Sequence, residues 1–139
     1  MHGISTHAGR QLIGDAVTVL NPRDGEFAAT IATLRKDRCA FSLGERLRAP
    51  APEPDLRLVV AVLKRDAFDW LVEKATELGA SLIQPVITRR TVMDRVNTGR
   101  LGAIARGAAE QCERLSVPRL RDAAPLHAVL DSWDGARLF

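Results

Sequence analysis

The sequence predicts an α+β chain in two parts, a small antiparallel β-sheet followed by an α/β unit. Apolar residues alternate with polar ones in the N-terminal third, which is typical of half-buried strands, whereas continuous apolar runs and helical periodicity follow. Residues 49–54, which contain three alternating prolines, lie between the two patterns. Because polyproline-type segments stay extended, we predict that 49–54 is a linker between parts 1–48 and 55–139.

The N-terminal part contains a β-hairpin signal. Residues 16–20 and 27–31 alternate in polarity, and the turn-forming residues 21–25 separate them. A further strand is expected at 39–43, after the polar turn 35–38. These segments predict a small antiparallel sheet with a marginal core.

The α/β part opens with a continuous apolar run, Leu58–Leu63, which predicts a buried strand. Asp66 is a suitable N-cap for the helix that follows, and Gly79 is placed to end it. The apolar face of this helix is expected to contain Phe68, Leu71, Val72, Ala75 and Leu78.

A second apolar run, Leu82–Ile87, follows after a short turn. A strand, a helix and a second strand in this order predict a right-handed βαβ unit in a parallel sheet. Pro85 lacks an N–H donor, so it favours an edge position or a short strand.

A second helix is predicted from Thr98, as its cap, to about Leu115, with Pro118 just beyond its end. Gly107 costs about 1 kcal/mol relative to alanine inside a helix, so we expect close packing there as compensation. Its apolar stripe is expected to contain Leu101, Ile104, Ala105, Ala108, Cys112 and Leu115.

Positive charge is concentrated in the second part. The whole chain has 20 Lys plus Arg against 17 Asp plus Glu, but residues 86–121 hold eight arginines against three acidic residues, a net of +5. Guanidinium groups bind phosphates and stack on unpaired bases, which indicates RNA; a solvated helix face is the alternative. Few aromatics could stack on bases, since Tyr is absent and Trp70 and Trp133 can face a core or an interface.

The carboxyl ends of parallel strands face the ligand crevice in open α/β sheets. Lys64 and Arg90 each follow a predicted strand, so both are candidate site residues, and Arg90 is the stronger of the two.

Other chemistries have little support. Cys39 and Cys112 form no C-x-x-C motif, and the three histidines show no ligand or triad spacing, so we expect no metal and two reduced thiols. No phosphate-binding glycine loop, signal peptide or membrane-spanning apolar run occurs, and a soluble cytoplasmic protein is expected.

Two motif blocks carry a family resemblance. KATELG at 74–79 follows Lys64 and Asp66, and EQCERLSVP at 110–118 follows Arg90. With these blocks, the chain resembles the bacterial 16S rRNA uracil-N3 methyltransferases of the knotted SPOUT superfamily. Residues 14–31 are similar to the small PUA-like β-barrel of that family.

The resemblance implies an incomplete PUA-like β-barrel followed by the N-terminal half of a SPOUT α/β knot domain. Arg89 stands where the family usually has Glu, and Glu113 where it usually has Gly. Family members continue past Leu138 and Phe139, where another strand begins, into the cofactor-holding knot. Their first barrel strand is missing or altered in residues 1–13, so we expect truncation at both ends.

The implied activity is S-adenosylmethionine-dependent methylation of N3 of a uridine in 16S rRNA, with the small ribosomal subunit as partner and a homodimer as the assembly. The cofactor site is expected in the knot and not in this chain, which by itself should be weak or inactive. No catalytic base is identified. The alternatives are a non-catalytic RNA-binding or ribosome-associated module, and a decayed fragment without a stable fold.

The residues expected to bind RNA or to face the active site are Arg90, Arg114, Lys64, Glu110, Gln111 and Arg89, and all of them except Arg89 match the motifs of the resembling family. Glu110, Gln111 and Arg114 lie near the end of the second helix, and for them a hydrogen-bond network without a chemical role is the alternative. The N-terminal sheet has two interpretations as well, since it can position RNA or merely pack on its neighbour.

Overall fold

The computed structural model describes residues 3–5, 12–91 and 95–136, so His2, His7 and the strand expected at Leu138 lie outside it. The chain divides into two compact units, residues 1–53 with 106–117 and residues 54–105 with 118–139. Each unit contains one β-sheet.

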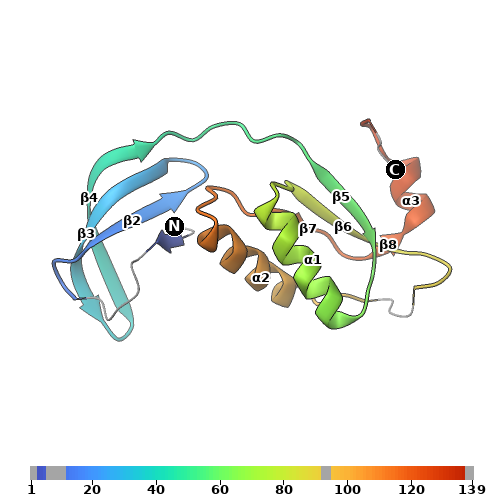
Figure 1. The fold of residues 1–139 in the computed structure, drawn as a ribbon, viewed down its shortest axis with the longest axis horizontal. Coiled ribbons are helices and arrows are strands. Elements are labelled where there is room, and N and C mark those ends of the chain that lie inside the picture. The colour runs from blue at the N-terminus through green and yellow to red at the C-terminus, as the bar shows by residue number, and fades with distance from the viewer. Residues whose placement is uncertain (1–2, 6–11, 92–94, 137–139) are drawn as a thin grey trace. The chain divides into compact units, whose positions relative to one another are not determined.

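The first unit contains an antiparallel sheet in the order β1-β2-β3-β4 (Figure 1). Its strands are β1 (Gly3–Ser5), β2 (Ala16–Asn21), β3 (Gly25–Arg35) and β4 (Arg38–Arg48). The predicted hairpin is confirmed, since β2 pairs with β3, and β4 extends well beyond the predicted 39–43. In the segment where the family's first barrel strand was expected to be missing or altered, the structure has the three-residue strand β1, which pairs with β2.

This sheet is open among the described residues, with β1 and β4 at its edges, and it does not close into a barrel. The β2–β3 turn is held by Asn21, whose side-chain oxygen accepts hydrogen bonds from the backbone nitrogens of Arg23 and Asp24 at 2.8 and 2.7 Å. Alternate residues of β2 and β3 form its core, Val17, Val19, Ala29 and Ile31, with Phe27 and Phe41 packed against them.

The second unit contains a parallel sheet of β5 (Arg57–Ala61), β6 (Leu82–Ile87), β7 (Arg119–Leu120) and β8 (Ala124–Pro125). β5 and β6 pair in parallel and α1 (Arg65–Glu77) connects them, so the predicted parallel βαβ unit is confirmed (Figure 1). β5 is only half-buried, because it is an edge strand. A short helix that was not predicted, α3 (Leu126–Asp131), contacts β6 and β8.

Pro85 occupies the central strand, so its predicted edge position was wrong. β6 pairs with β5 on one side and with both β7 and β8 on the other. The carbonyl of Val86 accepts a hydrogen bond from Val62 on the β5 side. By the alternation of a strand, the backbone nitrogen of Pro85 faces the other side. There β7 pairs only with the start of β6 and β8 only with its end, so the missing donor falls between them.

Helix α1 begins at Arg65, and its N-cap is Lys64 without a side-chain hydrogen bond, so the predicted cap at Asp66 was wrong. Lys64 is the last extended residue, and Asp66 is already inside the first turn. Gly79 ends the helix with a φ of 97°, as predicted. Leu78 is 80% exposed rather than on the apolar face, because it caps the helix where the chain turns away. The buried side chains are Phe68, Val72 and Thr76.

Helix α2 (Thr98–Gln111) is shorter than predicted. Asn97, not Thr98, is its cap, since the side-chain oxygen of Asn97 accepts a hydrogen bond from the backbone nitrogen of Arg100 at 2.9 Å. Glu113 has a φ of 54°, which continues no right-handed helix. The close packing expected at Gly107 was wrong, because a Cβ there would meet nothing within 4 Å. The buried residues of α2 are Leu101, Ala105, Ala108 and Ala109. Cys112, which was expected on the apolar stripe, is exposed.

Gly25→Ala should destabilise the protein more than Gly14→Ala. Both glycines have positive φ values, 97° and 98°. A Cβ at Gly14 meets nothing within 4 Å, whereas one at Gly25 would lie 2.1 Å from the backbone oxygen of Arg48. We expect a loss of about 1–2 kcal/mol at Gly14 from backbone strain alone and about 3 kcal/mol or more at Gly25. Urea unfolding followed by circular dichroism measures both, and equal losses would contradict the predicted clash.

Candidate functional site

A cavity of about 490 Å³ opens in the second unit, where the chain leaves the carboxyl end of β5. Two stretches of chain line it. One runs from the end of β5 into the first turns of α1, and the other leads into the first turn of α2. The lining residues are Val62, Leu63, Arg65, Phe68, Arg95, Val96, Asn97, Arg100 and Leu101.

The lining is cationic, because it includes three arginines and no acidic residue. Arg65 and Arg95 are exposed. Arg100 is partly buried and forms an ion pair with Asp69 of α1, through one of its terminal nitrogens. Oδ1 of Asp69 is buried and has no hydrogen-bond partner among the described residues. The cavity can therefore attract an anion through two exposed guanidinium groups and one that is held in place.

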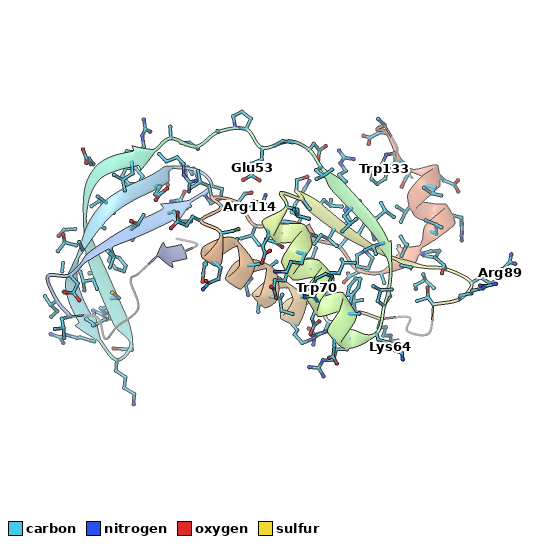
Figure 2. The ribbon with its side chains drawn as sticks, viewed as in Figure 1. Glu53, Lys64, Trp70, Arg89, Arg114 and Trp133 are labelled. Carbon is cyan, nitrogen blue, oxygen red and sulfur yellow. The ribbon has the colours of Figure 1, made fainter. Side chains whose placement is uncertain are left out.

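The predicted residues Lys64, Arg89 and Arg90 lie on exposed segments of the same unit, and none of them lines this cavity. Lys64 separates β5 from α1, and Arg89 lies on the loop after β6, far from Lys64 in Figure 2. That loop is held by Thr91, whose hydroxyl accepts a hydrogen bond from the backbone nitrogen of Thr88 at 2.9 Å. The two strand ends therefore do not bring Lys64 and Arg89 together.

Sequence reasoning did not select Arg65, Arg95 or Arg100 as site residues. Arg95 and Arg100 were part of the counted arginine cluster, and Arg65 directly follows Lys64. One available signal was Asn97, an asparagine at helix-capping position between two of these arginines. A cap at Asn97 places Arg100 in the first turn of the helix, close to Arg95 along the chain.

Arg114 lies in the first unit and forms a network with Glu53 and Ser116 (Figure 2). Its guanidinium pairs with the Glu53 carboxylate and donates a hydrogen bond to the Ser116 hydroxyl at 3.1 Å. The Ser116 hydroxyl also donates to Glu53, and the Arg114 side chain is only 12% exposed. Glu110 and Gln111 are exposed at the end of α2. Arg114 thus belongs to a hydrogen-bond network, and its role toward RNA or the active-site face stays a prediction.

A neighbouring contact also joins the sheet of the first unit to the segment after α2. Arg48 of β4 donates a hydrogen bond to the carbonyl of Glu113 at 2.6 Å and forms an ion pair with Glu26 at 2.8 Å. Arg48 and Arg114 thus use their guanidinium groups within the protein.

The pKa of Glu53 is lowered by this network. Burial raises the pKa of its carboxyl, but the hydrogen bonds from Ser116 and Arg114, with the charge of Arg114, lower it by more. The net pKa lies below that of an ordinary glutamate, so the ionised carboxylate is the form that the network stabilises.

The two tryptophans have different surroundings. Trp70 of α1 is 64% exposed and therefore does not belong to the core. Trp133 lies 5.7 Å from the guanidinium of Arg57, a cation–π distance, and lines a smaller cavity of about 150 Å³. Arg57 also pairs with Asp55 and Asp134, and the hydrogen bond to Asp55 is the main cause that raises its pKa.

Within the described part of the chain, no group of three or more His, Cys, Asp or Glu side chains could hold a metal ion. Cys39 and Cys112 are free and exposed. None of the helices described is long and apolar enough to cross a membrane.

Residues 50–139 match a family described as the RNA methyltransferase domain. The chain belongs to this family. It is 33% identical over 130 residues to the ribosomal RNA small subunit methyltransferase E of Rickettsia conorii, a match that covers 94% of this chain and 53% of that protein. The chain therefore spans about half the length of this relative.

Solved structures show the same fold. A Legionella pneumophila methyltransferase in complex with its cofactor SAM is 25% identical, has a TM-score of 0.74, and aligns with 88% of this chain and 54% of its own. The ribosomal RNA small subunit methyltransferase E of Neisseria gonorrhoeae, bound to S-adenosyl methionine, has a TM-score of 0.77 at 22% identity, covering 88% of this chain and 53% of its own. At that identity the likeness concerns the fold alone.

Glu53→Gln should destabilise the first unit at neutral pH by about 1 kcal/mol, because it weakens a partly buried charged pair. A carboxyl whose folded pKa is lowered contributes stability above its unfolded pKa and loses it as the pH falls through the folded value. The difference between the two proteins should therefore be full at pH 7 and shrink below about pH 4.3, the ordinary glutamate pKa.

Urea unfolding at a series of pH values measures this difference. Glu45→Gln, which changes an exposed carboxylate of β4, is the matched control and should have little effect at any pH. A difference for Glu53→Gln that stays constant down to pH 3 would exclude an ionised Glu53 as the origin of the stabilisation.

Proposed function

We propose that this chain takes part in S-adenosylmethionine-dependent methylation of N3 of a uridine in 16S rRNA. Membership of the RNA methyltransferase domain family supports this proposal. So do the name of the Rickettsia relative, a small subunit rRNA methyltransferase, and the cofactor in the Legionella structure. The position N3 rests on the motif blocks KATELG and EQCERLSVP.

The observation that carries the RNA part of the proposal is the cavity with Arg65, Arg95 and Arg100. RNA is a polyanion, and binding through phosphates is the main source of affinity in such complexes. The cavity lies at the carboxyl end of β5, the edge at which ligands bind in open α/β sheets.

The same cavity does not fit S-adenosylmethionine. The cofactor carries a sulfonium cation, and the lining offers it two exposed arginines and Arg100, whose charge Asp69 balances, but no acidic residue. These residues are therefore assigned to the RNA and to no catalytic step. Their contribution to methyl transfer is to orient the RNA, since fixed orientation is a large source of rate enhancement.

We further propose that the sheet of the first unit is a PUA-like module that positions RNA and that the protein acts as a cytoplasmic homodimer. The exposed strand β4 has arginines at Arg38 and Arg46, which suits contact with a polyanion. Two exposed apolar side chains, Trp70 on α1 and Leu78 just after its end, would suit contact with a second copy. In this proposal Lys64, Arg89 and Arg90 remain candidates for RNA contact.

A non-catalytic RNA-binding or ribosome-associated module is the second candidate function. The cationic cavity supports this function as well, because binding of RNA there requires no methyl donor. The two candidates predict the same RNA affinity and differ in cofactor binding and in product.

The test is to incubate the 139-residue chain with S-adenosylmethionine and small ribosomal subunits that lack this methyl group. We expect a small amount of N3-methyluridine in the digested 16S rRNA, measured by mass spectrometry, because the chain by itself should be weakly active. Calorimetric titration of S-adenosylmethionine measures donor binding. Binding of 16S rRNA with neither product nor donor binding would support the RNA-binding module instead. Absence of 16S rRNA binding would contradict both functions.

A further inference from the structure

We propose that the arginine cavity binds one unpaired nucleotide of a single-stranded RNA segment. Arg65 and Arg95 hold the phosphate, and the apolar wall contacts the base. This inference rests on the proposed function, because it specifies the form of the RNA and the residues that recognise it.

The positions of two arginines favour a bound anion. Arg65 is the first residue of α1, whose first turn also contains Asp66, and Arg100 lies in the first turn of α2, which contains no acidic residue. A cation at a helix N-terminus opposes the helix dipole and costs a few tenths of a kcal/mol to about 1 kcal/mol. Neither arginine is therefore placed where the helix dipole favours its charge, and such placements are expected where a site needs the charge.

The three guanidinium groups differ in how they are held. Arg100 pairs with Asp69, so its position is set by the protein. Arg65 and Arg95 are exposed, and their side chains can turn toward a phosphate. Guanidinium binds phosphate oxygens through two parallel hydrogen bonds, which suits these two residues to the RNA backbone.

The rest of the lining suits a base better than a free phosphate. Val62, Leu63, Phe68, Val96 and Leu101 give the cavity an apolar wall. Leu63 is 40% exposed, so part of this wall is open to a ligand. A volume of about 490 Å³ lies within the range of about 300–1,000 Å³ for small-molecule sites. Only a base released from a duplex stack can enter such a cavity.

The experiment measures the affinity of the 139-residue chain for fluorescein-labelled single-stranded oligouridine, by anisotropy at several salt concentrations. Arg65→Ala and Arg95→Ala should each weaken binding by about tenfold, the loss of one charged hydrogen-bonded contact. Each should also make the dependence of log K on log salt shallower by about 0.7, the change for one phosphate contact on a single strand. Duplex RNA of the same length should bind more weakly and show a smaller effect of either substitution.

Arg119→Ala is the matched control. It removes the same charge from an exposed position of the same unit, but Arg119 pairs with Leu82 at the opposite end of β6. It should change the affinity less than twofold. Thermal unfolding should be alike for Arg95→Ala and Arg119→Ala, since each changes an exposed side chain. Arg65→Ala should unfold at the same or a slightly higher temperature, because it removes a cation from a helix N-terminus.

The possible outcomes separate this inference from the proposed function. Wild-type affinity in both cavity variants, with good binding by the unaltered chain, would overturn the cavity as the site while RNA binding stands. An equal loss in Arg119→Ala would overturn it as well, because net charge would then explain the effect. No binding of any RNA by the unaltered chain would overturn the RNA-directed function together with the cavity.

Discussion

The burial of β6 between β5 on one side and β7 with β8 on the other is the constraint on which the second unit depends. Five of its six residues are buried, so every polar group of the strand must find a partner inside the protein. Gln84 meets this demand with its side-chain amide, which donates to the carbonyls of Pro85 and Asp122 at 2.8 and 2.9 Å. The contact with Asp122 holds the segment between β7 and β8 against the central strand.

This arrangement explains why the sheet tolerates a proline at its centre. Two short strands, rather than one long strand, pair with the far side of β6, and Pro85 lies where neither reaches. Candidate site residues lie after the carboxyl ends of two paired strands, β5 and β6. The cavity lies where the chain leaves β5, and the exposed loop with Arg89 and Arg90 follows β6.

The arginines of this chain fall into groups with different tasks, which net charge alone does not separate. Arg48, Arg57 and Arg114 use their guanidinium groups on carboxylates or a carbonyl of the protein. Arg65 and Arg95 are exposed beside an apolar wall, and Arg100 stands between the groups because Asp69 holds it. Residues that pair inside the protein stabilise a unit, whereas exposed ones at a cavity are available to a polyanionic ligand.

The sequence by itself determined the hairpin, the parallel βαβ unit, the bounds of β6 and the stop at Gly79. These features depend on local periodicity and on backbone conformations that only certain residues adopt. The tertiary structure decided the central place of Pro85, the true caps at Lys64 and Asn97, and the partners of Arg114. It also decided which arginines share a cavity. The two caps are local, and neighbouring residues competed for each of them. The other features depend on contacts between residues distant in the sequence, and a pattern along the chain carries no information about which distant side chains will meet.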